Sequence, residues 1–482
     1  MTTYMMIFES FSRLLLLLAL AWFVMTNLQY FSYRYDRLLF HHTKPLWTIF
    51  YLIVPILLYY VGGQFYWIFL YIVYLPVLYM WHRKLDKKLV LTARIKRFFA
   101  ILIAIECLSE ASYYYYRFDG DKGVVFILLA ALIISHAIET VFRYRFRVLA
   151  HQKLLKRENL TVIALTASYG KTSAKHFLTQ ILSQRFKTYA TPGNVNTDLG
   201  ICADINNHLP DDAEIYIVEA GARQKGDILS IALLTEPHYS IIGKVGAQHI
   251  EYFKTIENIQ STKRELLVSP RMKLGVVHES AGVKPNNEVL IVRDEQIQNT
   301  KATLDGTEWD LALEEKTIHF KTPVLGSFNA LNISLAFLLA RTLGIADDAI
   351  VQTVASLKNF DHRLQPIRTT HKLILDDSYN GNLEGMLSAI ELAATYEGRK
   401  VIVTPGIVES DEASNITLAA RINEVFDLVL ITGAMNADIL SSKIDRAKRK
   451  RIFDKRDMQT MLGANTRTGD LILFANDAPT FV

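Results

Sequence analysis

The stretch from Thr161 to Ser173 carries residue types that bind a phosphate chain: Thr-Val-Ile-Ala-Leu-Thr-Ala-Ser-Tyr-Gly-Lys-Thr-Ser. Its apolar, β-favouring start predicts a buried strand, Thr166–Gly170 a tight loop, and Lys171 the beginning of a helix. Loop and helix-start N–H groups would then point at an anion, with Lys171 reaching the outer phosphates and the Thr172 hydroxyl binding Mg²⁺. Leu165 replaces the first glycine of the common G-x-x-x-x-G-K-[ST] pattern, and a bare Gly-Lys-Thr also begins ordinary helices.

Two further strands end in candidate metal ligands. The run Ile215–Val218 is closed by Glu219, and the run Tyr239–Lys244 leads to His249. Open α/β sheets place their chemistry at the carboxyl ends of strands. Alone, Glu219 fits a surface acid and His249 a capping residue; together with the phosphate loop they predict a magnesium site.

The elements that must position these residues are predicted to be parallel sheets. From about Glu158, short β-branched runs alternate with amphipathic helices, as in βαβ units. After Arg363 we predict strands at Leu373–Asp376, Val401–Pro405, Leu428–Thr432 and Leu471–Ala475. Roughly 120 residues there suffice for a separate nucleotide-binding-like domain. Ser441–Arg451 is predicted to be a basic helix, with a solvated face or a face on anionic lipid.

The first 148 residues have a different character. Hydrophobic residues make up 50% of the whole chain and aromatic residues 11%, which is rich for a soluble enzyme. Apolar runs occur at about Leu14–Leu28, Pro45–Val61, Phe65–Trp81, Phe98–Tyr116 and Val124–Val141. Several approach the roughly 20 residues that cross a bilayer, and charges are mostly confined to the connections. We therefore predict about five transmembrane helices; buried core helices are the alternative.

Basic residues in the connections predict the orientation. They gather after the first, third and fifth runs, whereas Gly62-Gly63-Gln64 has none. The positive-inside tendency then places the amino terminus outside and everything after Arg143 in the cytoplasm. The first run lacks a small-residue cleavage site, so we interpret it as a retained helix. Two cysteines, Cys107 and Cys202, fit a reducing compartment.

Ionisable residues inside the predicted spans are expected to face other helices or water, because their exposure to lipid is costly. They are Glu106, Glu110, His136 and Glu139. A transport or substrate site is the alternative interpretation. Since most basic clusters sit at predicted membrane exits and the net charge is only +5, no nucleic-acid partner is expected.

Eight pieces of the sequence occur in the order found in one enzyme family. They are Ala-Leu-Thr-Ala-Ser-Tyr-Gly-Lys-Thr-Ser (164–173), Thr-Pro-Gly-Asn-Val-Asn-Thr-Asp-Leu-Gly (191–200), Val-Glu-Ala-Gly-Ala-Arg-Gln-Lys-Gly-Asp-Ile (218–228), Gln-His-Ile-Glu (248–251), Ser-Thr-Lys-Arg-Glu (261–265), Leu-Gly-Ser-Phe-Asn-Ala-Leu-Asn (325–332), His-Arg-Leu-Gln (362–365) and Asp-Asp-Ser-Tyr-Asn-Gly-Asn (376–382). Over about residues 158–482 the chain resembles the Mur ligase superfamily. Asp-Asp-Ser-Tyr-Asn favours the UDP-N-acetylmuramoyl-tripeptide:D-alanyl-D-alanine ligases (MurF type).

The resemblance implies a fold and a reaction. Residues 1–148 would be the membrane region, 149–360 a central ATP-binding domain of P-loop Mur-ligase type, and 361–482 a Rossmann-like domain. ATP and Mg²⁺ would activate a peptide carboxylate of UDP-MurNAc-tripeptide as an acyl phosphate, which the amine of D-alanyl-D-alanine attacks. Such a chain would sit in the bacterial cytoplasmic membrane with its catalytic domains in the cytoplasm, in contact with the lipid bilayer and beside other cell-wall synthesis enzymes.

The resemblance also assigns roles to matching positions. ATP contacts would come from Ser168, Gly170, Lys171, Thr172, Ser173, Asn329, Asn332, Arg363, Asp377 and Tyr379. Magnesium ligands would be Thr172, Glu219 and His249, and catalytic roles would fall to Lys171, His249, Lys263 and Arg363, with Lys263 as a carbamate. The peptide substrates would contact Asn194, Asn196, Thr197, Asn380 and Asn382. The asparagines also fit caps and turns, and Arg363 fits a solvated helix end.

Departures from the family pattern leave alternatives open. Ala167 replaces a loop glycine, Phe328 a histidine and Leu383 a proline. The membrane region stands where the family has its UDP-sugar-binding domain, so a lipid-linked substrate is an alternative to a soluble one. Two other functions remain as candidates. One is another membrane-associated amide ligase, such as a poly-γ-glutamate synthetase, and the other is a membrane scaffold or transporter switched by a nucleotide. The combination of Lys263 and Arg363 with the phosphate loop argues against the scaffold.

Overall fold

The computed structural model describes residues 3–31, 33, 46–85, 87–116, 123–247, 250–379, 381–407, 411–433 and 436–476. The chain forms two compact units, Met1–Arg145 and Phe146–Val482. The first boundary therefore falls three residues before the predicted one at 148, and the division at 360 stays a prediction.

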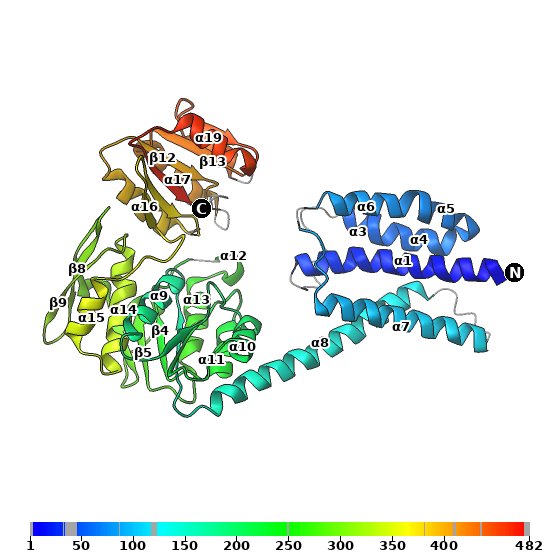
Figure 1. Cartoon of the computed structure of the whole chain (residues 1–482), viewed down its shortest axis with the longest axis horizontal. Helices are drawn as coiled ribbons and strands as arrows, with labels where there is room; N and C mark the ends of the chain where they lie inside the picture. The colour runs from blue at the N-terminus through cyan, green and yellow to red at the C-terminus, as the bar shows by residue number, and fades with distance from the viewer. Residues whose placement is uncertain are drawn as a thin grey trace. The chain divides into compact units, whose positions relative to one another are not determined.

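The first unit is helical (Figure 1). Its long helices are α1 (Thr3–Tyr30), α7 (Ala93–Tyr116) and α8 (Val124–Leu155). Between α1 and α7 the described part of the chain forms two runs of consecutive helical segments. The first run is α3 (Leu46–Thr48), η1 (Ile49–Ile53) and α4 (Val54–Val61), and the second is η2 (Gly63–Phe65), α5 (Tyr66–Ile68), η3 (Phe69–Tyr74) and α6 (Leu75–Arg83). Each predicted apolar run thus lies in helical segments, apart from Pro45, which is outside the described residues. Among the described residues, three helices are long and apolar enough to cross a membrane: Tyr4–Tyr30, Gly63–Arg83 and Val124–Leu155. Leu46–Val61 is a shorter apolar helix, and a five-span membrane region stays a prediction.

Charged side chains in this unit pair across helices. Arg13 of α1 donates to Glu106 of α7 at 2.8 Å and also contacts Glu110. Arg97 of α7 contacts Glu139 of α8 at 2.6 Å. The predicted placement of the three glutamates against other helices is confirmed.

The second unit begins with a six-stranded parallel sheet. Its strands are β1 (Thr161–Thr166), β2 (Thr188–Ala190), β3 (Ile215–Glu219), β4 (Tyr239–Ile242), β5 (Leu274–His278) and β6 (Val289–Val292), in the order β2-β3-β1-β4-β5-β6. The surrounding helices are α9 (Lys171–Leu182), α10 (Asp198–Asn207), α11 (Asp227–Thr235), α12 (Ile250–Phe253), α13 (Ile256–Arg264), α14 (Phe328–Thr342) and α15 (Asp347–Val354), with 3₁₀ turns η4 (Glu265–Leu267), η5 (Glu279–Ala281) and η6 (Asp294–Gln296). The predicted βαβ architecture is confirmed, with β1 in the interior of the sheet.

The next element is a three-stranded antiparallel sheet, which was not predicted from the sequence. It consists of β7 (Ile297–Thr303), β8 (Gly306–Ala312) and β9 (Thr317–Thr322). Buried residues alternate with half-buried ones in β8 and with exposed ones in β9, and Trp309 and Phe320 stack at 5.0 Å. Phe337 of α14 packs edge-on against Phe320 at 5.2 Å, which joins this sheet to the main core.

The remaining strands form a second six-stranded sheet. They are β10 (Gln365–Arg368), β11 (Leu373–Asp377), β12 (Lys400–Thr404), β13 (Leu428–Thr432), β14 (Arg449–Ile452) and β15 (Leu471–Ala475), in the order β10-β11-β15-β12-β13-β14. All neighbours are parallel except β10 and β11. The helices are α16 (Leu383–Ala394), α17 (Glu412–Val425), α18 (Ala437–Lys443) and α19 (Met458–Asn465), with the 3₁₀ turn η7 (Lys455–Asp457). The four predicted strands are confirmed within one residue.

The predicted basic helix at Ser441–Arg451 is wrong. Helix α18 ends at Lys443, and the chain re-enters the sheet as the edge strand β14. Pairing with β13 supplies the backbone hydrogen bonds, and Ile452 is buried at its end. Lysine and arginine favour helices individually, but this tertiary pairing overrides a weak local preference.

Candidate active site

The phosphate loop has the predicted strand, loop and helix. Strand β1 ends at Thr166 and helix α9 starts at Lys171, with Gly170 between them at φ +75°. A side chain there would be strained, and its Cβ would lie 2.6 Å from Nδ2 of Asn332. The residue before α9 must therefore be glycine, which keeps the amino end of the helix accessible to an anion.

Lys171 is folded back onto the loop. Its Nζ donates to the carbonyl oxygens of Ala167 at 2.8 Å and Ser168 at 3.1 Å. Burial lowers the pKa of Lys171 to about 8; the Glu219 carboxylate opposes that effect, and the Arg363 charge adds to it. An entering phosphate would bring negative charge close to this ammonium and so favour its charged form.

Thr172 and Glu219 line one cavity of about 390 Å³. Both residues are buried, and Nδ2 of Asn196 donates to Oε1 of Glu219 at 3.1 Å. A hydroxyl and a carboxylate are hard oxygen donors of the kind that Mg²⁺ prefers. The chemistry of this donor pair therefore fits the predicted magnesium site.

Lys175 is a buried residue of this site that the sequence analysis missed. Its Nζ lies 3.1 Å from Oε2 of Glu219 and donates to the carbonyl oxygens of Thr191 and Gly193, both at 2.7 Å. It follows Lys171 by four residues, so both lie on one face of α9. That spacing was the available signal.

Lys263 lies behind the phosphate loop. Its Nζ donates to Oγ1 of Thr166 at 3.3 Å, and only 4% of the residue is exposed. Burial lowers the pKa of Lys263 well below its ordinary value, the Lys171 charge adds to this, and Glu219 opposes it. Burial thus makes protonation of this amine less favourable, and the neutral amine is the form that reacts with carbon dioxide.

Two predicted site residues, His249 and Asn380, lie outside the described residues. Their roles as metal ligand and substrate contact stay predictions.

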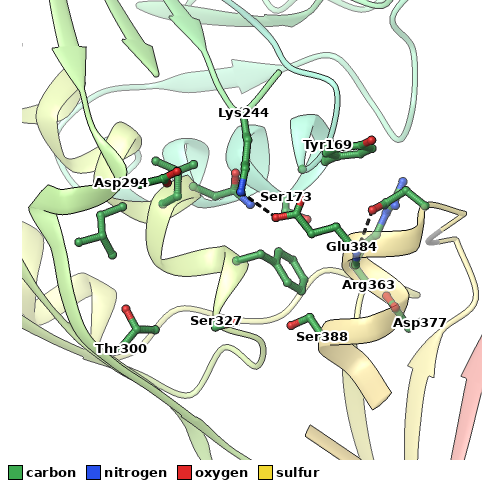
Figure 2. A pocket seen from close by; sticks show the side chains of 17 residues that line it. Tyr169, Ser173, Lys244, Asp294, Thr300, Ser327, Arg363, Asp377, Glu384 and Ser388 are labelled. Atoms are coloured by element: carbon green, nitrogen blue, oxygen red, sulfur yellow. Dashed lines mark hydrogen bonds and ion pairs between the residues drawn. The ribbon is translucent and has the colours of Figure 1, made fainter. Parts of the chain in front are cut away.

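A second cavity of about 310 Å³ adjoins the loop and is shown in Figure 2. It shares Tyr169, Gly170, Ser173, Arg363 and Asn382 with the first cavity. Asn332, Phe328 and Ile297 contribute to its wall, and Asp377 reaches it from β11. The two cavities therefore form one trough, with the phosphate loop at their junction.

Most predicted site residues lie along this trough. Those in its walls are Ser168, Gly170, Lys171, Thr172, Ser173, Asn194, Asn196, Glu219, Asn332, Arg363, Asp377, Tyr379 and Asn382. Asn329, Thr197 and Lys263 are not among the wall residues. Asn329 accepts at Oδ1 from Nδ2 of Asn332 at 3.1 Å, and Thr197 caps α10 by accepting from the N–H of Gly200 at 3.4 Å.

Arg363 approaches the trough from the second sheet. One guanidinium nitrogen donates to the carbonyl oxygen of Tyr379 at 2.7 Å. Its Nε is buried and has no hydrogen-bond partner in the described part of the chain. A buried donor without a partner is costly, so this atom is suited to an anionic ligand. Burial lowers the pKa of Arg363, and Asp377 and Glu219 oppose the shift.

Asn382 and Asp377 have structural partners as well. Asn382 caps α16 by accepting from the N–H of Gly385 at 2.8 Å, which agrees with the alternative of a helix cap. Asp377 accepts from the N–H of Leu364 at 3.0 Å and so fixes the chain beside Arg363.

The sequence analysis also missed an ion pair across the second cavity. Nζ of Lys244, just after β4, lies 2.8 Å from Oε1 of Glu384 in the first turn of α16, as Figure 2 shows. Although burial opposes the charge, the Glu384 carboxylate raises the pKa of Lys244. The pair links the two sheets at the mouth of this cavity.

Asp294 lines the same cavity and is hydrogen-bonded to a buried histidine, His278. His278 is hydrogen-bonded through Nε2 to Asp294 at 3.1 Å and through Nδ1 to Ser280 at 2.7 Å. With Glu279, His278 and Asp294 bring potential metal-ligand atoms within 4.8 Å of one another. The hydrogen bonds of both ring nitrogens account for this group without a metal.

Comparison with known proteins shows what this chain is similar to. The family model of the Mur ligase middle domain matches residues 165–340. Curated relatives include the UDP-N-acetylmuramoyl-tripeptide--D-alanyl-D-alanine ligases of Escherichia coli, 30% identical over 52% of this chain and 58% of that protein, and Bacillus subtilis, 26% identical over 65% and 72%. This chain thus spans less than two thirds of the Escherichia coli relative.

Solved structures share the fold. The Thermotoga maritima MurF ligase in complex with ADP superposes with a TM-score of 0.61 at 24% identity, covering 70% of this chain and 80% of that one. Acinetobacter baumannii MurF gives a TM-score of 0.61 at 23% identity, covering 70% and 77%. The second unit therefore has the α/β fold of the Mur ligases, and residues 165–340 match the Mur ligase middle domain.

Proposed function

We propose that this chain is an ATP-dependent ligase that joins D-alanyl-D-alanine to a UDP-MurNAc-tripeptide in peptidoglycan precursor synthesis. The observation that carries the proposal is the trough itself. A phosphate loop, the Glu219 carboxylate and a guanidinium with a partnerless buried Nε line one cavity. The names of the curated relatives support the choice of substrates.

The reaction would proceed in two transfers. A carboxylate oxygen of the tripeptide attacks the γ-phosphorus of ATP, and ADP leaves. The amine nitrogen of D-alanyl-D-alanine then attacks the acyl carbon, phosphate leaves, and the nitrogen loses a proton. No bond to a side chain is needed, so catalysis consists of positioning and charge neutralisation.

The residues would divide this work by their place in the trough. Lys171 and the amino end of α9 bind the β- and γ-phosphates, and Arg363 contacts the phosphoryl group in transfer. Thr172 and Glu219 would hold Mg²⁺, which neutralises phosphate charge when bound. Asn194 and Asn196 would contact the carboxylate substrate, and Asn332 would contact the adenine base of ATP. A carbamate formed on the Lys263 amine would supply an anion that helps to order a second Mg²⁺, for which His249 is the predicted ligand.

We also propose that the first unit anchors the enzyme in the bacterial cytoplasmic membrane, with the second unit in the cytoplasm. Three apolar helices of sufficient length support the anchor. The cytoplasmic side is supported by the basic residues that follow the last apolar run, and by the need for ATP.

The test is phosphate release by the detergent-purified full chain with Mg-ATP, UDP-MurNAc-tripeptide and D-alanyl-D-alanine, each omitted in turn. We expect release only with all three, and its loss in Lys171→Ala. The ligated product is then identified by mass. Release that continues without D-alanyl-D-alanine, or no release from the complete mixture, would exclude this reaction and leave a different amine or a lipid-linked acceptor to be tried.

A further inference from the structure

The carboxyl-terminal end of α8 is an integral part of the second unit. Ala150 and Leu154 are 0% and 1% exposed and belong to the same apolar cluster as Ile201 and Ile205 of α10. Nζ of Lys153 donates to the carbonyl oxygen of Ile205 at 2.9 Å. The end of α8 that lies in the second unit is therefore packed against α10.

Arg147 makes the most specific contact of this helix end. One guanidinium nitrogen forms an ion pair with Asp198 and donates to Oγ of Ser230 at 3.1 Å. The other donates to the carbonyl oxygen of Ser230 at 2.7 Å. Oγ of Ser230 in turn donates to Asp198 at 2.6 Å, so three groups from α8, α10 and α11 close one network.

Asp198 stands at the end of the loop that enters the trough. It is the first residue of α10, directly after the cap Thr197. Asn194 and Asn196 of the same loop line the cavity beside Glu219. Asn196 is tied to that strand end twice, through its Nδ2 to Glu219 at 3.1 Å and through its carbonyl oxygen, which accepts from the N–H of Gly221 at 2.8 Å. A shift of Asp198 would therefore move residues that face the substrate.

We propose that Arg147 is a positioning residue: the membrane-anchoring helix, through Arg147, sets the place of the loop 194–198 that binds the carboxylate substrate. This assignment of the substrate rests on the proposed function. A guanidinium suits the task because its planar fork reaches a carboxylate and a carbonyl at once, which a lysine does not.

The proposed effect lies in loop position more than in overall stability. The side chains of Arg147 and Asp198 are 29% and 28% exposed, so water competes for their charges. Ion pairs that exposed contribute little to the free energy of folding. The buried residues Ala150 and Leu154 hold the helix in place without Arg147.

The chain supplies a matched control. Arg157 follows the same helix and also donates to main-chain carbonyls, those of Pro210 at 2.7 Å and of Asp211. These carbonyls follow α10 and do not line either cavity. Arg157→Ala therefore removes arginine contacts to main-chain carbonyls just after the end of α8, without touching the loop 194–198.

Steady-state kinetics of the full chain in detergent test the proposal. In Arg147→Ala we expect the KM for UDP-MurNAc-tripeptide to rise by about tenfold, with the KM for ATP changed by less than about twofold. Arg147→Lys should recover part of the loss, and Arg157→Ala should match the unchanged protein. An equal KM rise in both alanine variants, or none in Arg147→Ala, would overturn the proposal.

Amide hydrogen exchange of the same proteins provides a readout that needs no substrate. Faster exchange is expected over residues 191–202 in Arg147→Ala, and over residues 207–214 in Arg157→Ala. Unchanged exchange over 191–202 in Arg147→Ala would refute the positioning role. If the unaltered protein formed no product, the proposed reaction would fail, while the exchange pattern would still decide whether Arg147 holds the loop. Should Arg147→Ala not fold, Arg147→Lys is measured in its place.

Discussion

Lys175 illustrates how the site is held together at the level of single residues. Its ammonium lies between the Glu219 carboxylate and two main-chain carbonyls, and 4% of the residue is exposed. Removing one partner of a buried ion pair leaves the other charge uncompensated, which costs more than removing both.

We therefore expect Lys175→Met to lower the free energy of unfolding by about 3 kcal/mol. The measurement is urea denaturation of the full chain in detergent. The double variant Lys175→Met/Glu219→Gln should lose less than the single one, because no charge remains buried. Lys187→Met removes an exposed pair with Asp212 and should have almost no effect; an equal loss in both lysine variants would contradict the assignment.

His238 gives a pH dependence outside the catalytic trough. Its Nδ1 accepts from the N–H of Val162 in β1 at 3.0 Å. Burial lowers the pKa of His238 to about 4, and the charges of Arg271 and Lys273 add to the shift. The folded state therefore keeps the ring neutral where the unfolded chain, with an ordinary pKa near 6.5, already binds a proton.

Because the unfolded state binds more protons in that range, stability should fall as the pH drops from about 6.5 to about 4. His238→Asn keeps an acceptor and removes the titration, so its stability should fall less over the same range. Urea midpoints measured at pH 7, 6, 5 and 4.5 compare the two proteins. Parallel curves would show that His238 does not contribute.

At the level of elements, an ion pair beside the second cavity joins the parts of the chain that carry the two sheets. The Lys244–Glu384 pair has side chains that are 39% and 52% exposed. We expect Glu384→Gln to change the free energy of unfolding by less than about 1 kcal/mol, because exposed pairs are well hydrated. The same urea assay, repeated at about 0.05 and 0.5 M salt, checks this. A large loss of unfolding free energy that does not depend on salt would contradict the prediction and show that the pair stabilises the fold.

The elements also show what the sequence could predict. The strand, loop and helix around Lys171 follow from local patterns: an apolar run, a glycine and a helix start. Strand β14 does not, because basic residues favour a helix until β13 offers backbone partners. The β7–β9 sheet was missed because its alternation is mixed with charged residues and is recognisable only once Trp309 meets Phe320 and Phe337.

For the candidate site, the sequence predicted the cavity-lining residues that belong to a local motif, such as those of the phosphate loop. It missed Lys175 and the Lys244–Glu384 pair, because their partners come from other strands and helices. The predicted ligand contacts of Asn329 and Thr197 stay predictions; the hydrogen bonds described for them tie Asn329 to Leu325 and Thr197 to Gly200. Such distinctions depend on the packing of distant segments.

At the level of the whole molecule, the arrangement of the first unit across a membrane is open to a direct test. In a Cys107→Ser/Cys202→Ser background, Gln64→Cys lies in the connection without basic residues, and Lys88→Cys in a basic one. Both positions are exposed. A membrane-impermeant maleimide should label Gln64→Cys in intact cells and Lys88→Cys only after permeabilisation. The reverse pattern would invert the topology, and equal labelling of both would argue against the predicted spans.

The meeting of Gly170 with Asn332 has a consequence for the whole catalytic unit. Gly170 lets the phosphate loop turn, and the side-chain amide of Asn332 occupies the space where a Cβ at position 170 would lie. Asn332 belongs to α14 and stands more than a hundred and fifty residues further along the chain. Neither partner can move or grow without displacing the other. If ATP binds in the trough as proposed, a larger side chain at position 332 should displace the phosphate loop as well as the adenine base.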